Sequence, residues 1–233
     1  MTDTKNTATA FASLSLAASS LDNLTQLGYT QMTPIQAASL PLTLAGRDLI
    51  AQASTGSGKT AAFGIPLVEK LDAAQFDAQA LVLCPTRELA DQVTQEIRRL
   101  ARAVGNIKVV TLCGGVALRG QTQSLEHGAH VVVGTPGRIM DHLERGSLSL
   151  QGLKMLVLDE ADRMLDMGFF DDIAKVARQC PKDRQTLLFS ATYPEGIAKL
   201  ASQFMREPQT VKVQAQHDAQ KIKQIFYEVS NSE

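Results

Sequence analysis

The sequence has no surplus of either sign of charge, which limits what its surface as a whole can attract. Its 233 residues include 23 Lys and Arg against 24 Asp and Glu, a net charge of −1. A protein that attracts nucleic acid through its overall field carries a marked basic surplus. Any contact between this chain and RNA or DNA must therefore be local.

Cysteines and long apolar runs are also scarce. Cys84, Cys113 and Cys180 lie far apart and lack the Cys-x-x-Cys spacing of a metal or redox site, so we expect small buried side chains in a reducing compartment. Residues 1–10 are polar and lack the apolar core of a secretory signal, and no run reaches the roughly 20 apolar residues of a membrane span. We expect a cytoplasmic monomer without a membrane partner.

No internal repeat or low-complexity tract divides the chain, so one large α/β domain is the simplest organisation. Hydrophobic residues make up 44% and charged residues 20%, the composition of a globular protein with a sizeable core. Short β-rich runs alternate with helical segments, which predicts a mostly parallel sheet with helices on both faces. The predicted strands are 49–51, 80–84, 109–112, 131–133, 155–158, 186–189 and 211–213.

A helix is expected directly after the second of these strands. Its apolar positions are Leu89, Val93, Ile97, Leu100 and Val104. Their helical spacing predicts that this face packs on the sheet. The charged positions expected on the opposite face are Glu96, Arg98, Arg99 and Arg102.

A glycine-rich segment after the first predicted strand is the most specific feature of the sequence. A strand that enters such a turn and leaves as a helix points backbone N–H groups and the positive end of the helix at one small volume, where an anion binds. Lys59 would reach the β- and γ-phosphates, and the Thr60 hydroxyl would coordinate Mg2+. The residues predicted to bind nucleotide here are Ala53, Ser54, Thr55, Gly56, Ser57, Gly58, Lys59 and Thr60.

One position departs from the general pattern of such a loop. Ala53 stands where the pattern has glycine, but a small residue still allows the backbone to approach a phosphate closely. The competing interpretation is a turn that only caps a helix. The Lys-Thr pair after Gly-Ser-Gly favours the phosphate loop.

Acidic residues follow the strand predicted over 155–158. In an open parallel sheet, ligands bind at the carboxyl ends of the strands, so Asp159 and Glu160 are expected beside the phosphate loop. Asp159 would hold Mg2+ through water, and Glu160 would orient or deprotonate the attacking water. Alternatively, acidic residues at a strand end only favour the start of a helix.

Hydroxyl groups follow the strand predicted over 186–189. Those of Ser190 and Thr192 are placed to bond the carboxylate of Asp162 and to report the nucleotide state to the rest of the domain. A plain helix cap ahead of Pro194 is the alternative interpretation.

Three further strand ends carry hydroxyl, backbone N–H or guanidinium donors. Such groups hold a phosphodiester backbone without reading bases, and three sets in one sheet favour a shared anionic strand. Each set by itself is also compatible with a simple strand-to-helix turn. The candidate residues are Thr86, Arg87, Gly115, Thr135, Gly137 and Arg138.

With these motifs the sequence resembles the DEAD-box ATP-dependent RNA helicase family, which is named for the tetrapeptide that here is Asp159, Glu160, Ala161 and Asp162. A second segment, Gly28-Tyr29-x-x-x-x-Pro34-Ile35-Gln36, is similar to the family's adenine-binding motif. The resemblance implies a RecA-like P-loop NTPase domain that uses ATP and Mg2+ as cofactors.

The resemblance also implies roles for individual residues. Gln36 would bond the adenine edge and Tyr29 would stack on the base, and Phe11 is similar to the family's upstream aromatic residue. Ser190 and Thr192 would couple hydrolysis to strand separation, and the six donor residues above would contact RNA. The implied catalytic set is Lys59, Asp159, Glu160, Asp162, Ser190 and Thr192.

The sequence departs from the family in length. Family members have two RecA-like domains, and the second supplies arginines to the ATP site, but no His-Arg-x-Gly-Arg-x-x-Arg element occurs here. We therefore expect an N-terminal lead and helix (1–25), a RecA-like ATP-binding helicase domain (26–213), and an interdomain linker with the start of an absent second domain (214–233). Alone, the chain should be nearly inactive as an ATPase.

Within the family, the segments 81–115 and 162–169 most resemble the bacterial DbpA group, which acts on ribosomal RNA. This implies ATP-driven unwinding of RNA duplexes in ribosome assembly. Two other functions compete with it, a DNA translocase with the same core and an ATP-gated RNA clamp or adaptor that does not unwind. The Asp-Glu-Ala-Asp spelling favours RNA over DNA, and the intact Lys59, Asp159 and Glu160 favour turnover.

Overall fold

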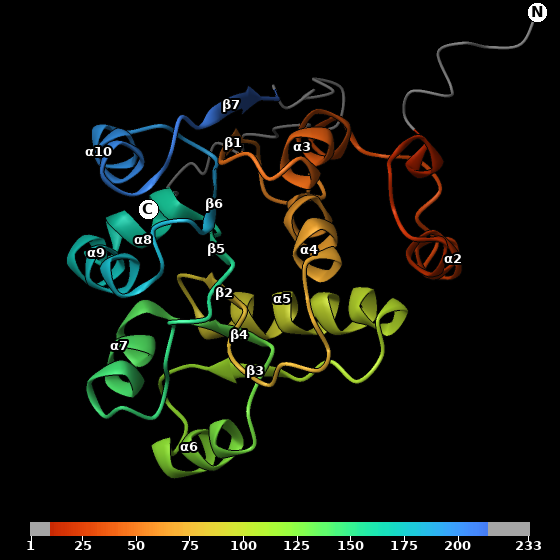
Figure 1. The fold of residues 1–233 in the computed structure, drawn as a ribbon. Helices are drawn as coiled ribbons and strands as arrows, with labels where there is room; N and C mark the ends of the chain where they lie inside the picture. The colour runs from red at the N-terminus through yellow and green to blue at the C-terminus, as the bar shows by residue number, and fades with distance from the viewer. Residues whose placement is uncertain (1–9, 214–233) are drawn as a thin grey trace, which may run out of the picture.

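The computed structural model describes residues 10–213 and consists of a seven-stranded sheet covered by helices (Figure 1). All neighbouring strands are parallel, in the order β3-β4-β2-β5-β6-β1-β7. The strands are β1 Leu49–Gln52, β2 Ala80–Leu83, β3 Val109–Leu112, β4 Val131–Gly134, β5 Met155–Leu158, β6 Gln185–Ser190 and β7 Gln209–Lys212. Each predicted strand is present, and the predicted α/β fold is confirmed.

Helices connect the strands and form the outer layers (Figure 1). They are α2 Ala18–Gln26, α3 Pro34–Leu44, α4 Lys59–Glu69, α5 Arg87–Leu100, α6 Leu118–Glu126, α7 Pro136–Glu144, α8 Ala161–Asp166, α9 Phe170–Gln179 and α10 Glu195–Phe204. Two short 3-10 helices are η1 Phe11–Ser13 and η2 Ala101–Ala103. No helix in the described part of the chain is long and apolar enough to cross a membrane.

Helices cover both faces of the central strands, whose successive residues point to opposite sides and are buried in β2, β4, β5 and β6. In β2, Val82 packs into a cluster that includes residues of α3, α4 and α5. Its neighbours Leu81 and Leu83 pack into a second cluster with residues of α7, α8, α9 and α10. The helices therefore lie on both faces, as predicted.

The N-terminal segment packs on the first of these clusters. Leu24 of α2 is buried there, and Leu14, Leu16 and Leu21 are partly buried against it. The polar residues at 1–9, and the linker and strand predicted over 214–233, lie outside the described residues.

The helix predicted after β2 ends earlier than its apolar spacing indicated. Helix α5 stops at Leu100, η2 follows, and Val104 is 36% exposed instead of packing on the sheet. Gly105 then has a φ of +70°, a left-handed conformation typical of helix ends. The prediction for Val104 was wrong because the helix ends at Leu100, although apolar residues continue at helical spacing to Val104.

The parallel arrangement places the carboxyl ends of all strands along one edge of the sheet. Because β1 pairs with β6 and β6 pairs with β5, the glycine-rich loop, Ser190 and Asp159 come together. The turns after β2, β4 and β3 follow farther along the same edge. Segments distant in sequence thus form two adjoining regions.

A buried carboxylate joins three strands at the opposite edge. Asp48 precedes β1 and is 4% exposed. Its Oδ1 accepts a hydrogen bond from the Thr186 backbone N–H in β6 (2.9 Å), and its Oδ2 accepts one from the Arg206 N–H ahead of β7 (2.7 Å). The carboxylate thereby ties β1 to both of its neighbours.

Asp48→Ala is expected to lower the free energy of unfolding by about 2 to 4 kcal/mol, because two N–H donors lose their acceptor. Asp48→Asn keeps one acceptor oxygen and should lose about half as much. Chemical denaturation of the three proteins measures these differences. If the alanine variant were as stable as the unmodified chain, the two hydrogen bonds would not be what joins the strands.

Candidate active site

The glycine-rich loop has the geometry needed to surround an anion. It leaves β1, and α4 begins at Lys59. Gly56 and Gly58 have φ angles of +80° and +92°, which residues with a Cβ rarely adopt. Ala53 is 2% exposed and its N–H donates to the Ser190 carbonyl (3.0 Å), so a small residue fits where the general pattern has glycine.

The loop is in direct contact with the predicted base-recognition residue. Gln36 is 2% exposed; its Nε2 donates to the Gly58 carbonyl (3.1 Å) and its Oε1 accepts from the Thr33 N–H (2.9 Å). A Cβ at Gly58 would lie 2.7 Å from Gln36 Nε2 and 2.9 Å from Thr33 Oγ1. Glycine is therefore required at this position by both its backbone and its neighbours.

Lys59 carries a buried charge without a hydrogen-bond partner. The residue is 6% exposed, and no described residue accepts a hydrogen bond from its Nζ. A buried ammonium without partners is costly, which indicates a site built for an anion. Phosphate oxygens fit the donors present, which are Lys59 Nζ, the loop N–H groups and the N-terminus of α4.

Asp159 adds a buried carboxylate to the same site. Burial raises the pKa of Asp159 to about 6 against the opposing effect of Lys59, and Glu160 raises it further. A divalent cation would neutralise this carboxylate, and the Thr60 hydroxyl offers a second hard oxygen on the same cavity wall. In the described chain no three His, Cys, Asp or Glu side chains are grouped to hold a metal, so Mg2+ would also need phosphate and water oxygens.

Glu160 adopts a left-handed backbone conformation ahead of α8, with a φ of +50°. Such a conformation is uncommon for a residue with a side chain and is often found at functional sites. Its carboxylate accepts from Thr55 Oγ1 (3.2 Å) and Arg163 Nη1 (3.4 Å), and its N–H donates to Asp159 Oδ1 (3.0 Å). Its side chain makes no capping hydrogen bond, but Glu160 stands at the N-cap position of α8 and Asp162 lies in the first turn, so the alternative that these acidic residues favour a helix start stays compatible with the structure.

A cavity of about 570 Å³ brings most of the predicted residues together. Those that line it are Tyr29, Gln36, Thr55, Gly56, Gly58, Lys59, Thr60, Asp159 and Glu160. Ala53, Ser54 and Ser57 are not among its lining residues, and Ser57 Oγ instead donates to the Ser54 carbonyl (2.7 Å) within the loop. Gly28 and Thr33, which belong to the segment that resembles the adenine-binding motif, line it as well, and the lining residues that the sequence analysis missed are Thr30, Gln31, Ala61, Leu89, Gln92 and Glu96.

Tyr29 is held from two sides at this cavity. Its hydroxyl donates to the Glu96 carboxylate, and its ring meets Phe11 edge to face with 5.8 Å between centroids. Burial raises the pKa of the Tyr29 hydroxyl, and Glu96 raises it further. The prediction that Glu96 lies on the face of α5 opposite the apolar residues was wrong. Its carboxylate instead accepts the hydrogen bond of Tyr29, which stands 67 residues earlier in the sequence.

Asp162 and Thr192 form the contact that the sequence predicted. The hydroxyl and N–H of Thr192 both donate to Asp162 Oδ2 at 2.9 Å, and the Asp162 N–H donates to the Ser190 hydroxyl at 3.3 Å. Burial pushes the pKa of Asp162 upward, but its hydrogen bonds with Thr192, Arg163 and Ser190 outweigh burial and keep the pKa below its usual value. The alternative of a helix cap is excluded, since α10 begins after Pro194 without a side-chain cap.

The candidate phosphodiester contacts lie farther along the same edge. Thr86 begins α5, and its hydroxyl accepts from the Leu89 N–H (3.3 Å), so the role of a helix cap applies here as well. The Arg87 side chain is half exposed and lies 3.7 Å from Asp91. Gly115, after β3, has a left-handed φ of +77°.

The turn after β4 presents a less accessible arginine. Thr135 precedes α7 without a side-chain cap, and the space beside Gly137 is open. The Arg138 side chain is only 14% exposed and donates to the Val116 carbonyl (3.0 Å) and to Gln121 Oε1 (2.9 Å). A guanidinium that we expected to face an anionic strand is thus shared with protein acceptors.

Comparison with known proteins gives one family. The DEAD/DEAH box helicase family matches residues 33–200. Over 224 residues the chain is 55% identical to ATP-dependent RNA helicase DbpA of Escherichia coli (strain K12). This match covers 96% of this chain and 49% of that protein. Over 222 residues it is 47% identical to DEAD-box ATP-dependent RNA helicase CshA of Geobacillus kaustophilus, with coverage of 95% and 47%. The chain spans about half the length of the curated relatives it matches.

Solved structures agree with this assignment. A DEAD box protein from the hyperthermophile Methanococcus jannaschii superposes with a TM-score of 0.85 at 43% identity, over 88% of this chain and 56% of that chain. A hypothetical ATP-dependent RNA helicase from Sulfolobus tokodaii gives 0.77 at 35% identity, over 85% and 57%. The α/β fold is therefore the RecA-like fold that the motifs implied.

Lys59→Met is expected to change the free energy of unfolding of the ligand-free chain by less than about 1 kcal/mol, because relief of a buried charge offsets its lost attraction to Asp159. Stabilisation by ADP, about 2.7 kcal/mol at 100 times Kd, should disappear. Denaturation with and without ADP measures both quantities. The control is Lys175→Met, which removes an exposed lysine of α9 and should keep the stabilisation by ADP. A large loss of stability in the ligand-free Lys59→Met variant would instead show that Lys59 has a structural role.

Proposed function

The chain belongs to the DEAD/DEAH box helicase family, and on this premise we propose that it is the ATP-binding N-terminal domain of an RNA helicase. The complete protein would couple ATP binding and hydrolysis to the unwinding of RNA duplexes. The observation that carries the proposal is the buried ammonium of Lys59, which has no hydrogen-bond partner among the described residues and shares a cavity with Asp159.

The residues of the cavity divide the work of phosphoryl transfer. Lys59 and the loop N–H groups hold the β- and γ-phosphates. Thr60 and Asp159 would hold Mg2+, which neutralises phosphate charge when bound. Glu160, whose carboxylate is positioned by Thr55, orients the attacking water or accepts its proton. The Asp162–Thr192 contact joins this chemistry to the end of β6.

Base recognition would come from Gln36 and Tyr29. After its contacts with Thr33 and Gly58, the Gln36 amide keeps one acceptor and one donor position. These match the N6 amine and N7 of adenine. The Tyr29 ring, held by Phe11 and Glu96, would stack on the base.

RNA would bind along the other half of the carboxyl edge through its backbone. The residues that we propose to contact it are Thr86, Arg87, Gly115, Thr135, Gly137 and Arg138. Ribosomal RNA, in ribosome assembly in the cytoplasm, is the substrate that we propose from the resemblance to the DbpA group. The near-neutral net charge of −1 supports local contacts of this kind over a general attraction to nucleic acid.

A second RecA-like domain would complete both sites. We propose residues 1–25 as a lead and helix, residues 26–213 as the ATP-binding domain and residues 214–233 as the link to that second domain. An arginine from a facing domain stabilises charge in the transition state of phosphoryl transfer. The half-length match to the curated relatives supports this division.

The chain is expected to bind ADP about tenfold or more tightly than GDP, because guanine has an oxygen where adenine has an amine, and the mismatch at Gln36 costs about 1 to 3 kcal/mol. Isothermal titration calorimetry measures both affinities. Gln36→Ala should remove the preference, whereas Gln92→Ala, a change at another glutamine of the cavity wall, should keep it. Equal affinity of the unmodified chain for ADP and GDP would contradict this role.

Phosphate release by the chain alone should be slow and insensitive to RNA, because an arginine from a second domain is typically worth about 10³ to 10⁵ in rate. A chimera with the C-terminal half of the Escherichia coli relative should regain hydrolysis that RNA, and not DNA, stimulates. Glu160→Gln in the chimera should bind ADP and stop turnover.

Two results would count against this function. Strong RNA stimulation of the chain alone would show that its site is already complete. A chimera that binds ATP and RNA together without hydrolysis would favour an ATP-gated clamp or adaptor.

A further inference from the structure

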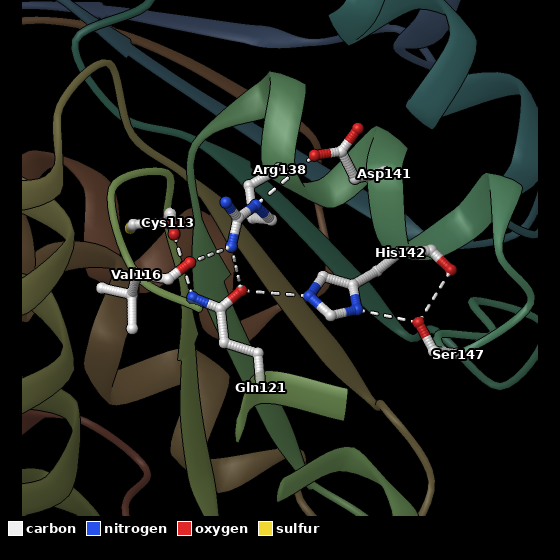
Figure 2. A network of polar contacts seen from close by, with 7 residues as sticks. All are labelled: Cys113, Val116, Gln121, Arg138, Asp141, His142 and Ser147. Atoms are coloured by element: carbon white, nitrogen blue, oxygen red, sulfur yellow. Dashed lines mark hydrogen bonds and ion pairs between the residues drawn. The ribbon is translucent and has the colours of Figure 1, made fainter. Parts of the chain in front are cut away.

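The turns after β3 and β4 are joined by a buried glutamine of α6 (Figure 2). Gln121 is 8% exposed. Its Nε2 donates to the Cys113 carbonyl (2.9 Å), and its Oε1 accepts from Arg138 Nη1 (2.9 Å) and His142 Nε2 (3.0 Å). One side chain therefore connects the end of β3 to two residues of α7.

These contacts fix which way the amide faces. Arg138 can only donate, so the Gln121 atom opposite it must be the oxygen. His142 then donates from Nε2, which leaves its Nδ1 to accept from the Ser147 hydroxyl (2.8 Å). Burial lowers the pKa of His142 below its usual value. The positive charges of Arg138 and Arg145 lower the pKa further, against the opposing effect of Asp141. The neutral tautomer that the network needs is thus the favoured one.

The same network holds Arg138 in one orientation. Nη1 also donates to the Val116 carbonyl (3.0 Å), and Nε lies 3.4 Å from Asp141 Oδ2. Within the described part of the chain, Nη2 makes no hydrogen bond to protein. The guanidinium plane is fixed, and one nitrogen remains for another acceptor.

The two glycines of the turn after β3 have open space beside them. Among the described residues other than the chain neighbours, none comes within 4 Å of the position where a Cβ would stand on Gly114, and for Gly115 only Arg87 Nη1 does, at 3.9 Å. Val116, the next residue, is 43% exposed. The hydrogen bonds from Gln121 to the Cys113 carbonyl and from Arg138 to the Val116 carbonyl therefore clamp this glycine turn at both ends.

We propose that Gln121 is a positioning residue for RNA binding, which holds the turn after β3 and the start of α7 together as one preformed surface. The inference rests on the RNA-binding function proposed above. Gln121 itself is too buried to contact RNA and acts through Arg138, Cys113 and Val116. A preformed surface binds more tightly because the cost of ordering a glycine turn is met during folding.

The test compares two buried glutamines. Gln121→Met keeps the length of the side chain and removes its three hydrogen bonds. We expect the Kd for a fluorescein-labelled oligouridylate, measured by anisotropy at low salt, to rise about five- to twentyfold, while the Kd for ADP changes by less than twofold. Gln79→Met is the matched control: Gln79 is 1% exposed and bonds Asp72, Gln75 and Lys154 at the opposite edge of the sheet.

The salt dependence separates positioning from loss of folded protein. Each lost single-strand phosphate contact lowers the slope of log affinity against log salt by about 0.7, so the slope for Gln121→Met should fall. Partial unfolding reduces the number of active molecules and leaves that slope unchanged. An unchanged slope, or an equal loss of RNA affinity in Gln79→Met, would overturn the inference.

Arg87→Ala distinguishes this inference from the proposed function. If Arg87→Ala weakens RNA binding and Gln121→Met does not, the inference about Gln121 is wrong and the proposed RNA surface stands. If the unmodified chain binds RNA no better than Arg87→Ala does, the proposed surface fails and the inference fails with it.

Discussion

The single direction of all seven strands is the constraint on which both proposed sites depend. Parallel strands bring their carboxyl ends to one edge, and the strand order decides which loops become neighbours there. With β1 between β6 and β7, and β6 next to β5, the phosphate loop meets Ser190 and Asp159, which lie more than 100 residues farther along the chain. The remaining strands, β2, β4 and β3, form the other half of the edge. Nucleotide and RNA would thus bind to one surface of one sheet.

A second constraint is electrostatic. Lys59 and Asp159 are both buried, at 6% and 2% exposure, and neither forms an ion pair within the described chain. Charges in such surroundings cost folding free energy, and the cores on both faces of the sheet must offset that cost. A site of this kind gains most from a ligand that brings both anionic oxygens and a cation, as a nucleotide with Mg2+ does. The surrounding protein holds the charges in place before the ligand arrives, so little rearrangement is needed on binding.

Local patterns were enough to predict the strands, the phosphate loop and the meeting of Asp162 with Thr192. The strands are short apolar runs, and the loop has a backbone geometry that only glycine-rich sequences allow. Local patterns failed where a contact joins distant segments. Helical spacing assigned Glu96 to the wrong side because its partner Tyr29 is 67 residues away. Helical spacing also extended the predicted helix to Val104, because a pattern of apolar residues does not show where the backbone turn that ends a helix lies.

The network around Gln121 illustrates the same limit. Nothing in the spacing of polar residues on α6 shows that one of them is buried against α7 and the end of β3. Its partners Arg138 and His142 follow 17 and 21 residues later. The donors at the strand ends, and then the family resemblance, marked Arg138 as a candidate RNA contact, but only the three-dimensional arrangement shows that its side chain is mostly buried.

The hydrogen bond from Gln36 to the Gly58 carbonyl has a consequence for the timing of nucleotide selection. Because the Gln36 amide donates to the Gly58 carbonyl, a displaced amide takes a hydrogen bond away from the loop. A base that displaces Gln36 therefore also disturbs the backbone that directly precedes Lys59. The phosphates of a wrong nucleotide would then be misaligned even when they are bound. Discrimination would then act through faster dissociation of the wrong nucleotide, and not only through a slower first encounter.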